Sequence, residues 1–217
     1  MMFEDKLSLE LAFFSKWIKV SDLDIDRGRR LGDQIFTWIK TNSKFKPDRC
    51  RFGGSFAKGT STFLKVDVDV TIYINFEGDK CNSHEVLYFL QRVREDWKDV
   101  LMLNTDLTEE DLSSGKNTVK FELQDFHFDL CPAINVSQDT NVQVSETLRI
   151  YQETDAENNK IGTCLDAAMS EAAVQFVKNQ SEYVRDLCRL TKFWQQGISY
   201  FRFKSGRSML FECIAIR

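Results

Sequence analysis

Residues 53–70 read GGSFAKGTSTFLKVDVDV, and this stretch decides the fold of the chain. Two glycines and a serine precede one predicted turn of helix, and a strand pattern follows in which Asp67 and Asp69 alternate with valines. Successive strand side chains point to opposite faces of a sheet, so the two carboxylates are expected on one face, about 7 Å apart along the strand. The valines between them are expected to face a core.

This pattern predicts a site for phosphate and divalent cations. Two carboxylates on one face repel each other unless a cation neutralises them, and hard oxygen ligands suit Mg²⁺, which phosphates and water commonly complete. Gly53 and Gly54 let the backbone approach a phosphate, and Ser55 at a helix N-cap can donate its hydroxyl to it. Lys58 adds positive charge at the same mouth. A plain turn beside a solvated strand face is the alternative, but the spacing of 12 residues from Ser55 to Asp67 favours the site.

A third carboxylate is expected from a second short strand over residues 126–130, which Pro132 is predicted to end. Asp129 is the candidate. Asp125 shares its parity and is the alternative, whereas His127, also of this parity, is expected to be a strand-face histidine. Strands over 66–76, 118–123 and 126–130, with a tight turn at Gln124-Asp125, predict a mixed sheet that holds all three aspartates.

Helices are predicted over residues 22–41, 84–100, 165–177 and 182–196. Residues 138–162 are polar, and the boundary between two lobes is placed at residues 160–161. On the last helix Arg185, Arg189 and Lys192 share one face, with Glu182 as the acidic neighbour, and they form the best cationic phosphate site of the chain. A smaller basic cluster, suited equally to phosphate or to a solubilising loop, comprises Lys44, Lys46, Arg49 and Arg51.

Composition limits the remaining possibilities. With 29 basic and 33 acidic residues the net charge is −4, so an RNA site would have to be a local patch. The six cysteines are never closer than 24 residues and there are two histidines, so a structural zinc is not expected. The sequence has neither a signal peptide nor a long apolar segment, which predicts a cytoplasmic protein with reduced cysteines and no membrane contact.

The combined motifs resemble those of the 2′-5′-oligoadenylate synthases, within the superfamily of cyclic GMP-AMP synthase-like nucleotidyltransferases. The matching elements are GGS, K-G-T and D-x-D in residues 53–69, D-x-x-P-A at Asp129–Ala133, and R-L-x-K-x-W at Arg189–Trp194. The resemblance implies an α+β fold, with a polymerase-β-like core at residues 1–160 that includes a long N-terminal spine helix. It also implies a C-terminal helical lobe that begins at 161 and is incomplete at 217.

The same resemblance implies roles for individual residues. Two Mg²⁺ ions would be held by the catalytic Asp67, Asp69 and Asp129, and the donor ATP by Gly54, Ser55, Lys58, Arg189 and Lys192. ATP would be donor and acceptor in the synthesis of 2′-5′-linked oligoadenylates, a step in antiviral innate immunity. Double-stranded RNA would be the activator, with Arg27, Arg29, Lys44, Lys46 and Lys178 as candidate contacts.

Two alternatives and one departure from the family pattern remain open. The same carboxylates would serve a cyclic dinucleotide synthase, and the chain could instead be a catalytically silent RNA-binding relative. The family places a tyrosine that stacks on the donor adenine where this sequence has Met209, so base selection is not predicted.

Overall fold

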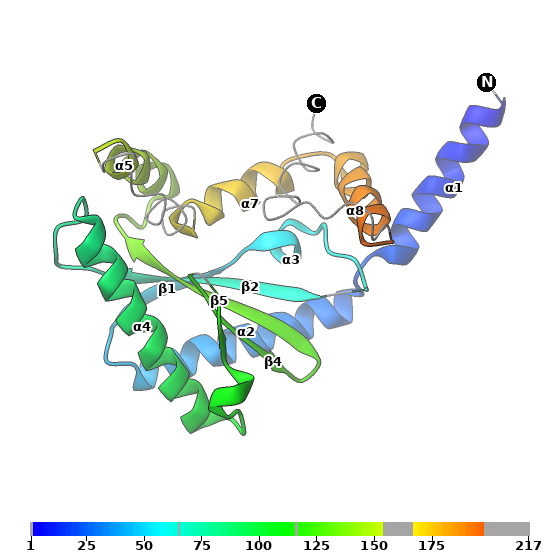
Figure 1. Ribbon diagram of the computed structural model, residues 1–217. Coiled ribbons are helices and arrows are strands. Elements are labelled where there is room, and N and C mark those ends of the chain that lie inside the picture. The colour runs from blue at the N-terminus through cyan, green and yellow to red at the C-terminus, as the bar shows by residue number, and fades with distance from the viewer. Residues whose placement is uncertain (1, 65, 116, 154–166, 198–217) are drawn as a thin grey trace.

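The structure is a computed structural model that describes residues 2–64, 66–115, 117–153 and 167–197 (Figure 1). Its five-stranded sheet has the order β1-β2-β5-β4-β3. The strands are β1 (Pro47–Phe52), β2 (Asp67–Asn75), β3 (Ser113–Ser114), β4 (Val119–Leu123) and β5 (Phe126–Asn135). β2 and β5 run parallel and the other neighbours antiparallel, so the predicted mixed sheet and α+β class are confirmed.

Helices cover both faces of this sheet (Figure 1). α2 (Asp22–Asn42) and α4 (Ser83–Asn104) pack on one face, and α3 (Gly54–Lys58) and α7 (Ser170–Lys178) lie on the other. Side chains cap both long helices: Ser21 accepts a hydrogen bond from the backbone N–H of Asp24, and Asn82 from that of Glu85. The remaining helices are α1 (Met2–Ile18), the short 3₁₀ helix η1 (Glu109–Asp111), α5 (Thr140–Glu153) and α8 (Glu182–Gly197).

The core lies between the sheet and the α2–α4 pair. Val68, Val70 and Ile72 of β2 are buried there, against side chains that include Ile35 of α2 and Trp97 of α4. Alternation holds over the first half of β2, where Asp67 and Asp69 face away from this core and are only partly buried. From Val70 to Ile74 every residue is buried, because the segment that leads into α7 covers the second face.

One expectation about secondary structure was wrong, and one helix was not predicted. Pro132 does not end its strand but lies within β5, paired with Ile72. It is tolerated because β4 stops pairing at Leu130, so no described strand continues on that side. The polar region after residue 138 contains α5, whose buried face is built from Gln143 and Thr147 as well as Ile150. The predicted lobe boundary at 160–161 and Met209 lie outside the described residues.

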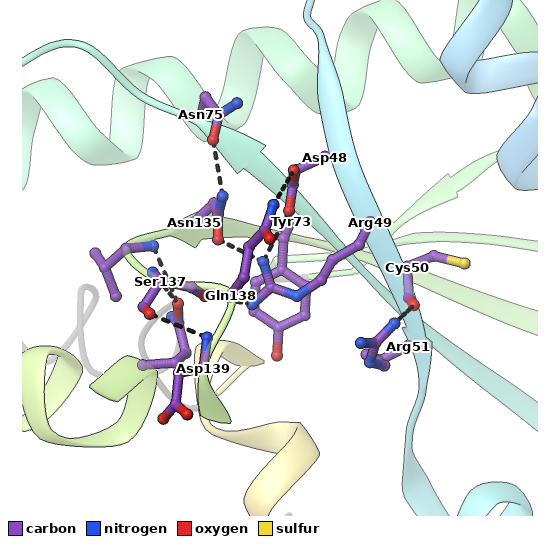
Figure 2. A network of polar contacts seen from close by, with 12 residues as sticks. Asp48, Arg49, Cys50, Arg51, Tyr73, Asn75, Asn135, Ser137, Gln138 and Asp139 are labelled. Atoms are coloured by element: carbon purple, nitrogen blue, oxygen red, sulfur yellow. Dashed lines mark hydrogen bonds and ion pairs between the residues drawn. The ribbon is translucent and has the colours of Figure 1, made fainter. Parts of the chain in front are cut away.

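Arg49 of β1 contacts side chains of β2 and β5 at the end of β2 remote from Asp67. Figure 2 shows this network of polar contacts. The Arg49 guanidinium donates to Asp48 (2.9 Å), to the side-chain oxygen of Asn135 (2.5 Å) and to the carbonyl of Ser137 (2.7 Å). It also stacks 4.0 Å from the ring centre of Tyr73. Arg51 pairs with Glu171 of α7 (2.8 Å). These two arginines of the basic cluster therefore make contacts that hold the fold together.

Candidate active site

Strand register brings the predicted acids together. β2 and β5 are adjacent and parallel, and Asp69 is the direct partner of Asp129, with Asp67 two residues earlier on the same face of β2. The prediction that these three carboxylates lie in one mixed sheet is therefore confirmed. Asp125 takes no part, because it lies with Gln124 in the two-residue hairpin turn, where both residues have positive φ (50° and 70°).

The glycine pair places the start of α3 directly against Asp69. The backbone N–H of Gly53 donates to the carbonyl of Asp69 (2.7 Å). Gly54 has φ +56°, and a Cβ at this position would lie 1.7 Å from the Asp69 Oδ2 atom. Only glycine permits both this backbone conformation and this approach. Gly53, not Ser55, is the N-cap of α3, so Ser55 lies in the first turn, where its hydroxyl accepts a hydrogen bond from Ser61 (3.0 Å).

The site is electrostatically unbalanced without added cations. The pKa of the Asp69 carboxyl is raised to about 6, first by burial and then by the nearby Asp129 and Asp67 carboxylates, while Lys120 and Lys58 oppose the rise. A carboxylate in this position gains more than a solvent-exposed one from a divalent cation, because the positive charge offsets both the burial and the repulsion from the neighbouring carboxylates.

Lys120 is a site residue that was not predicted. It lies on β4 opposite Asp129, and its ammonium group pairs with the Asp129 Oδ2 atom. Sequence could have found it: a two-residue hairpin turn at 124–125 pairs positions whose numbers sum to 249, which places Lys120 beside Asp129. Both residues line a cavity of about 340 Å³ that also reaches Asp67 and His127.

The oxygen donors suit a hard divalent cation, and Asp69, Asp129 and Asp67 are the residues that would hold it. Within the described ranges, no three His, Cys, Asp or Glu side chains lie close enough together to share one ion. Lys120 is paired with one oxygen of Asp129 in this arrangement.

The basic residues of α8 contact the loop after α3. Lys192 is buried and its ammonium donates to the Thr60 hydroxyl (3.0 Å), next to the Ser61 that contacts Ser55. Arg189 is 3% exposed and donates to the Gly59 carbonyl and to Asp186, an acidic partner that was not expected. Lys58 and Arg189 both line a second cavity of about 550 Å³, between α2, α3 and α8, in which Asp69 takes no part.

The candidate RNA contacts fall into two groups. Arg27 and Arg29 lie near the start of α2, and Arg29 lines the second cavity together with Lys178. Lys44 and Lys46 lie beyond the other end of α2, where the Lys44 Nζ atom is 3.8 Å from the Asp96 Oδ1 atom.

Each helix in the described part of the chain is too short or too polar to cross a bilayer.

Comparisons with known proteins support the fold. No known family and no curated protein matches the sequence. Among solved structures, CdnC of E. coli MS115-1 with ATP is similar at TM-score 0.56 and 19% identity, covering 94% of this chain and 62% of that chain. The STING-associated CdnE c-di-GMP synthase of Capnocytophaga granulosa is similar at TM-score 0.59 and 12% identity, covering 91% and 60%.

One further solved structure is similar to the chain. The GLD-2/RNP-8 complex matches at TM-score 0.55 and 16% identity, covering 96% of this chain and 55% of that chain. The chain thus spans between 55% and 62% of the length of these three structures. At such identities the likeness concerns architecture alone, and the mixed sheet with its flanking helices has the polymerase-β-like nucleotidyltransferase fold.

Proposed function

We propose that the chain is a Mg²⁺-dependent nucleotidyltransferase. The observation that carries this proposal is the contact of Gly54 with Asp69, since it fixes the start of α3 beside a carboxylate that is itself aligned with Asp129. Residues suited to a phosphate cradle thus lie next to carboxylates suited to a metal ion, which supports phosphoryl transfer as the reaction.

The residues would divide the work as follows. Gly54 and Ser55 would hold the donor triphosphate through backbone N–H groups and the serine hydroxyl. Lys192, whose ammonium lies at Thr60, would help to neutralise the negative charge of the triphosphate. Asp67, Asp69 and Asp129 would hold Mg²⁺, which when bound neutralises the carboxylates and polarises the transferred phosphoryl group. The acceptor hydroxyl would approach from the 340 Å³ cavity beside Asp129, so catalysis is mainly alignment and charge neutralisation.

The specific reaction we propose is the polymerisation of ATP into 2′-5′-linked oligoadenylates on sensing double-stranded RNA. Its support is the resemblance of GGS, K-G-T, D-x-D, D-x-x-P-A and R-L-x-K-x-W to the oligoadenylate synthases. A basic surface suited to an anionic activator supports the RNA part: Arg29, Lys178 and Arg185 meet around the 550 Å³ cavity behind α3. The residues of α3 that line this cavity link an activator there to the phosphate cradle.

A cyclic dinucleotide synthase is the second candidate. The observation that favours it is the structural likeness to a c-di-GMP synthase and to CdnC, and the same three carboxylates would serve it.

The test is incubation with ATP, GTP and MgCl₂, with and without a 40-base-pair RNA duplex, followed by anion-exchange chromatography. Linear products that resist a 3′-5′-specific nuclease support the oligoadenylate synthase, and cyclic products support the alternative. Asp69→Asn should abolish synthesis, while Asp125→Asn, an exposed carboxylate in the hairpin turn, should preserve it. Equal activity of the Asp69→Asn and Asp125→Asn proteins would refute the proposed site.

The RNA requirement has its own control. Arg29→Gln combined with Lys178→Gln removes two basic side chains from the rim of the 550 Å³ cavity without touching the aspartates. RNA-dependent synthesis should fall and its optimum should shift to lower salt, because fewer phosphates are neutralised. Unchanged stimulation by RNA in this double variant would exclude the surface as the activator site.

A further inference from the structure

Lys120 and Asp129 are brought together by backbone geometry. The two-residue turn at Gln124-Asp125 sets the β4–β5 register, and this register makes Lys120 the direct cross-strand partner of Asp129. The ammonium group of Lys120 reaches the Oδ2 atom of the carboxylate. An oxygen that we assign to a metal therefore already has a cation beside it.

The pair is open enough to exchange partners. The Lys120 side chain is 45% exposed and that of Asp129 is 26% exposed, and both line the 340 Å³ cavity. Lysine carries its charge on a flexible four-carbon stem, so its ammonium can swing into this cavity without any movement of the strand. An ion pair with this degree of exposure is weak, so a divalent cation can displace it.

We propose that Lys120 is a resident counter-ion that occupies Asp129 until a nucleotide-bound divalent cation displaces it, so that metal and nucleotide load together. This inference rests on the proposed function only in taking Asp129 as a metal ligand.

Charge explains why nucleotide would decide the exchange. A free divalent cation entering beside Asp69 and Asp129 is repelled by the Lys120 ammonium at short range. A cation that arrives on a triphosphate brings negative charge with it, which offsets that repulsion and offers the displaced ammonium a new partner. Lys120 would thereby keep the acids from being neutralised by metal alone, and would hold Asp129 in place meanwhile.

Binding of Mn²⁺, measured by electron paramagnetic resonance on the nucleotide-free protein, tests the proposal without any turnover. Lys120→Met should bind Mn²⁺ about three- to tenfold more tightly than wild type, because the competing ion pair is gone. Lys120→Arg keeps the charge and should bind no more tightly than wild type. Lys40→Met, an exposed lysine in the last turn of α2, removes the same charge far from the acids and should leave Mn²⁺ affinity unchanged.

A second measurement addresses the coupling to nucleotide. A non-hydrolysable ATP analogue should increase Mn²⁺ affinity more in wild type than in Lys120→Met, while thermal unfolding verifies that each variant is folded. Mn²⁺ binding by Lys120→Met that is equal to or weaker than wild type would overturn the proposal. Absence of Mn²⁺ binding in every variant, with nucleotide present, would instead refute the metal site on which the proposed function depends.

Discussion

Replacing Gly54 by alanine tests whether its close approach to Asp69 matters for activity, apart from its positive-φ backbone conformation. Gly59→Ala is the matched control. Both glycines flank the same short helix, α3, and both have positive φ, +56° and +72°. A Cβ at Gly54 would lie 1.7 Å from the Oδ2 atom and 2.5 Å from the Cγ atom of Asp69, whereas a Cβ at Gly59 would meet no atom within 4 Å. The two variants therefore share the backbone strain and differ in the collision with the carboxylate.

The expected magnitudes follow from these geometries. A left-handed conformation costs an L-residue about 1–2 kcal/mol, so each variant should lower the melting temperature by roughly 2–8 °C for a chain of this size. In Gly54→Ala the carboxylate must also rotate away or α3 must withdraw from β2. A displacement of about 1 Å at a reacting centre can cost 10²-fold in rate, so nucleotide transfer should fall by about 100-fold or more. Gly59→Ala should stay within about threefold of wild type, since its added methyl group contacts nothing that holds the substrate.

The assay pairs thermal unfolding with nucleotide incorporation from radiolabelled ATP, at saturating Mg²⁺. Gly54→Ala should be at least as destabilised as Gly59→Ala, because it adds the collision with Asp69, and activity should differ by at least tenfold. If Gly54→Ala retained activity comparable to that of Gly59→Ala, the contact between α3 and Asp69 would have no catalytic role, and the observation that carries the proposed function would fail.

Three other perturbations have defined outcomes. The pKa of Asp69 is raised to about 6 from 3.8, so the folded state holds this proton more tightly than the unfolded chain, and stability falls as pH rises from about 4 to 6. Asp69→Asn should thus raise the melting temperature of the metal-free protein at pH 8 and not at pH 4; an equal effect at both would contradict this. Arg49→Met should cost about 2–4 kcal/mol, because it leaves buried acceptors unpaired, and should leave Mn²⁺ affinity unchanged at the other end of β2. Tyr73→Phe removes a hydroxyl that donates to the Ala168 carbonyl (3.3 Å), so it should cost about 1 kcal/mol in urea unfolding; no loss would show that this contact does not stabilise the lobe.

The site could be predicted from sequence as far as local periodicity reaches. Alternation of Asp67 and Asp69 with valines specifies one face of one strand, and the Asp129 strand shows a similar pattern. Adjacency of the two strands, by contrast, depends on a connection through α4, η1, β3 and β4, which no short pattern encodes. The expectation that a third carboxylate completes the site supplied that step, and the parallel β2–β5 pairing confirmed it.

What sequence reasoning missed was mostly polar. α5 was not predicted because its inward positions are Gln143 and Thr147, whose side chains are buried by hydrogen bonding: the Gln143 side-chain oxygen accepts from the backbone N–H groups of Val136 and Ser137, both at 3.0 Å. Hydrophobic periodicity cannot detect such a face. Arg49 was likewise assigned to the surface because its stacking on Tyr73 and its bond to Asn135 join residues far apart in the chain.

The position of the candidate site is set by the part of the sheet that α7 and the residues just before it cover. The Ser170 hydroxyl donates to Thr71 (3.0 Å), and the Ala168 carbonyl meets Tyr73, so the second half of β2 is buried on both faces and can carry only apolar or satisfied side chains. The first half of the same strand lacks this cover, and there the outward positions are Asp67 and Asp69. A carboxylate at the Thr71 position would be sealed from water and from any cation. At position 69 the carboxylate lies at the edge of the surface that α7 covers, so it is buried enough to need a counter-charge and accessible enough to receive one. Exchanging Thr71 for aspartate should therefore destabilise the protein by at least as much as the loss of a buried hydrogen bond, and it should not create an additional Mn²⁺ site. A new Mn²⁺ site in that variant would show that cover by α7 does not limit where the acids can function.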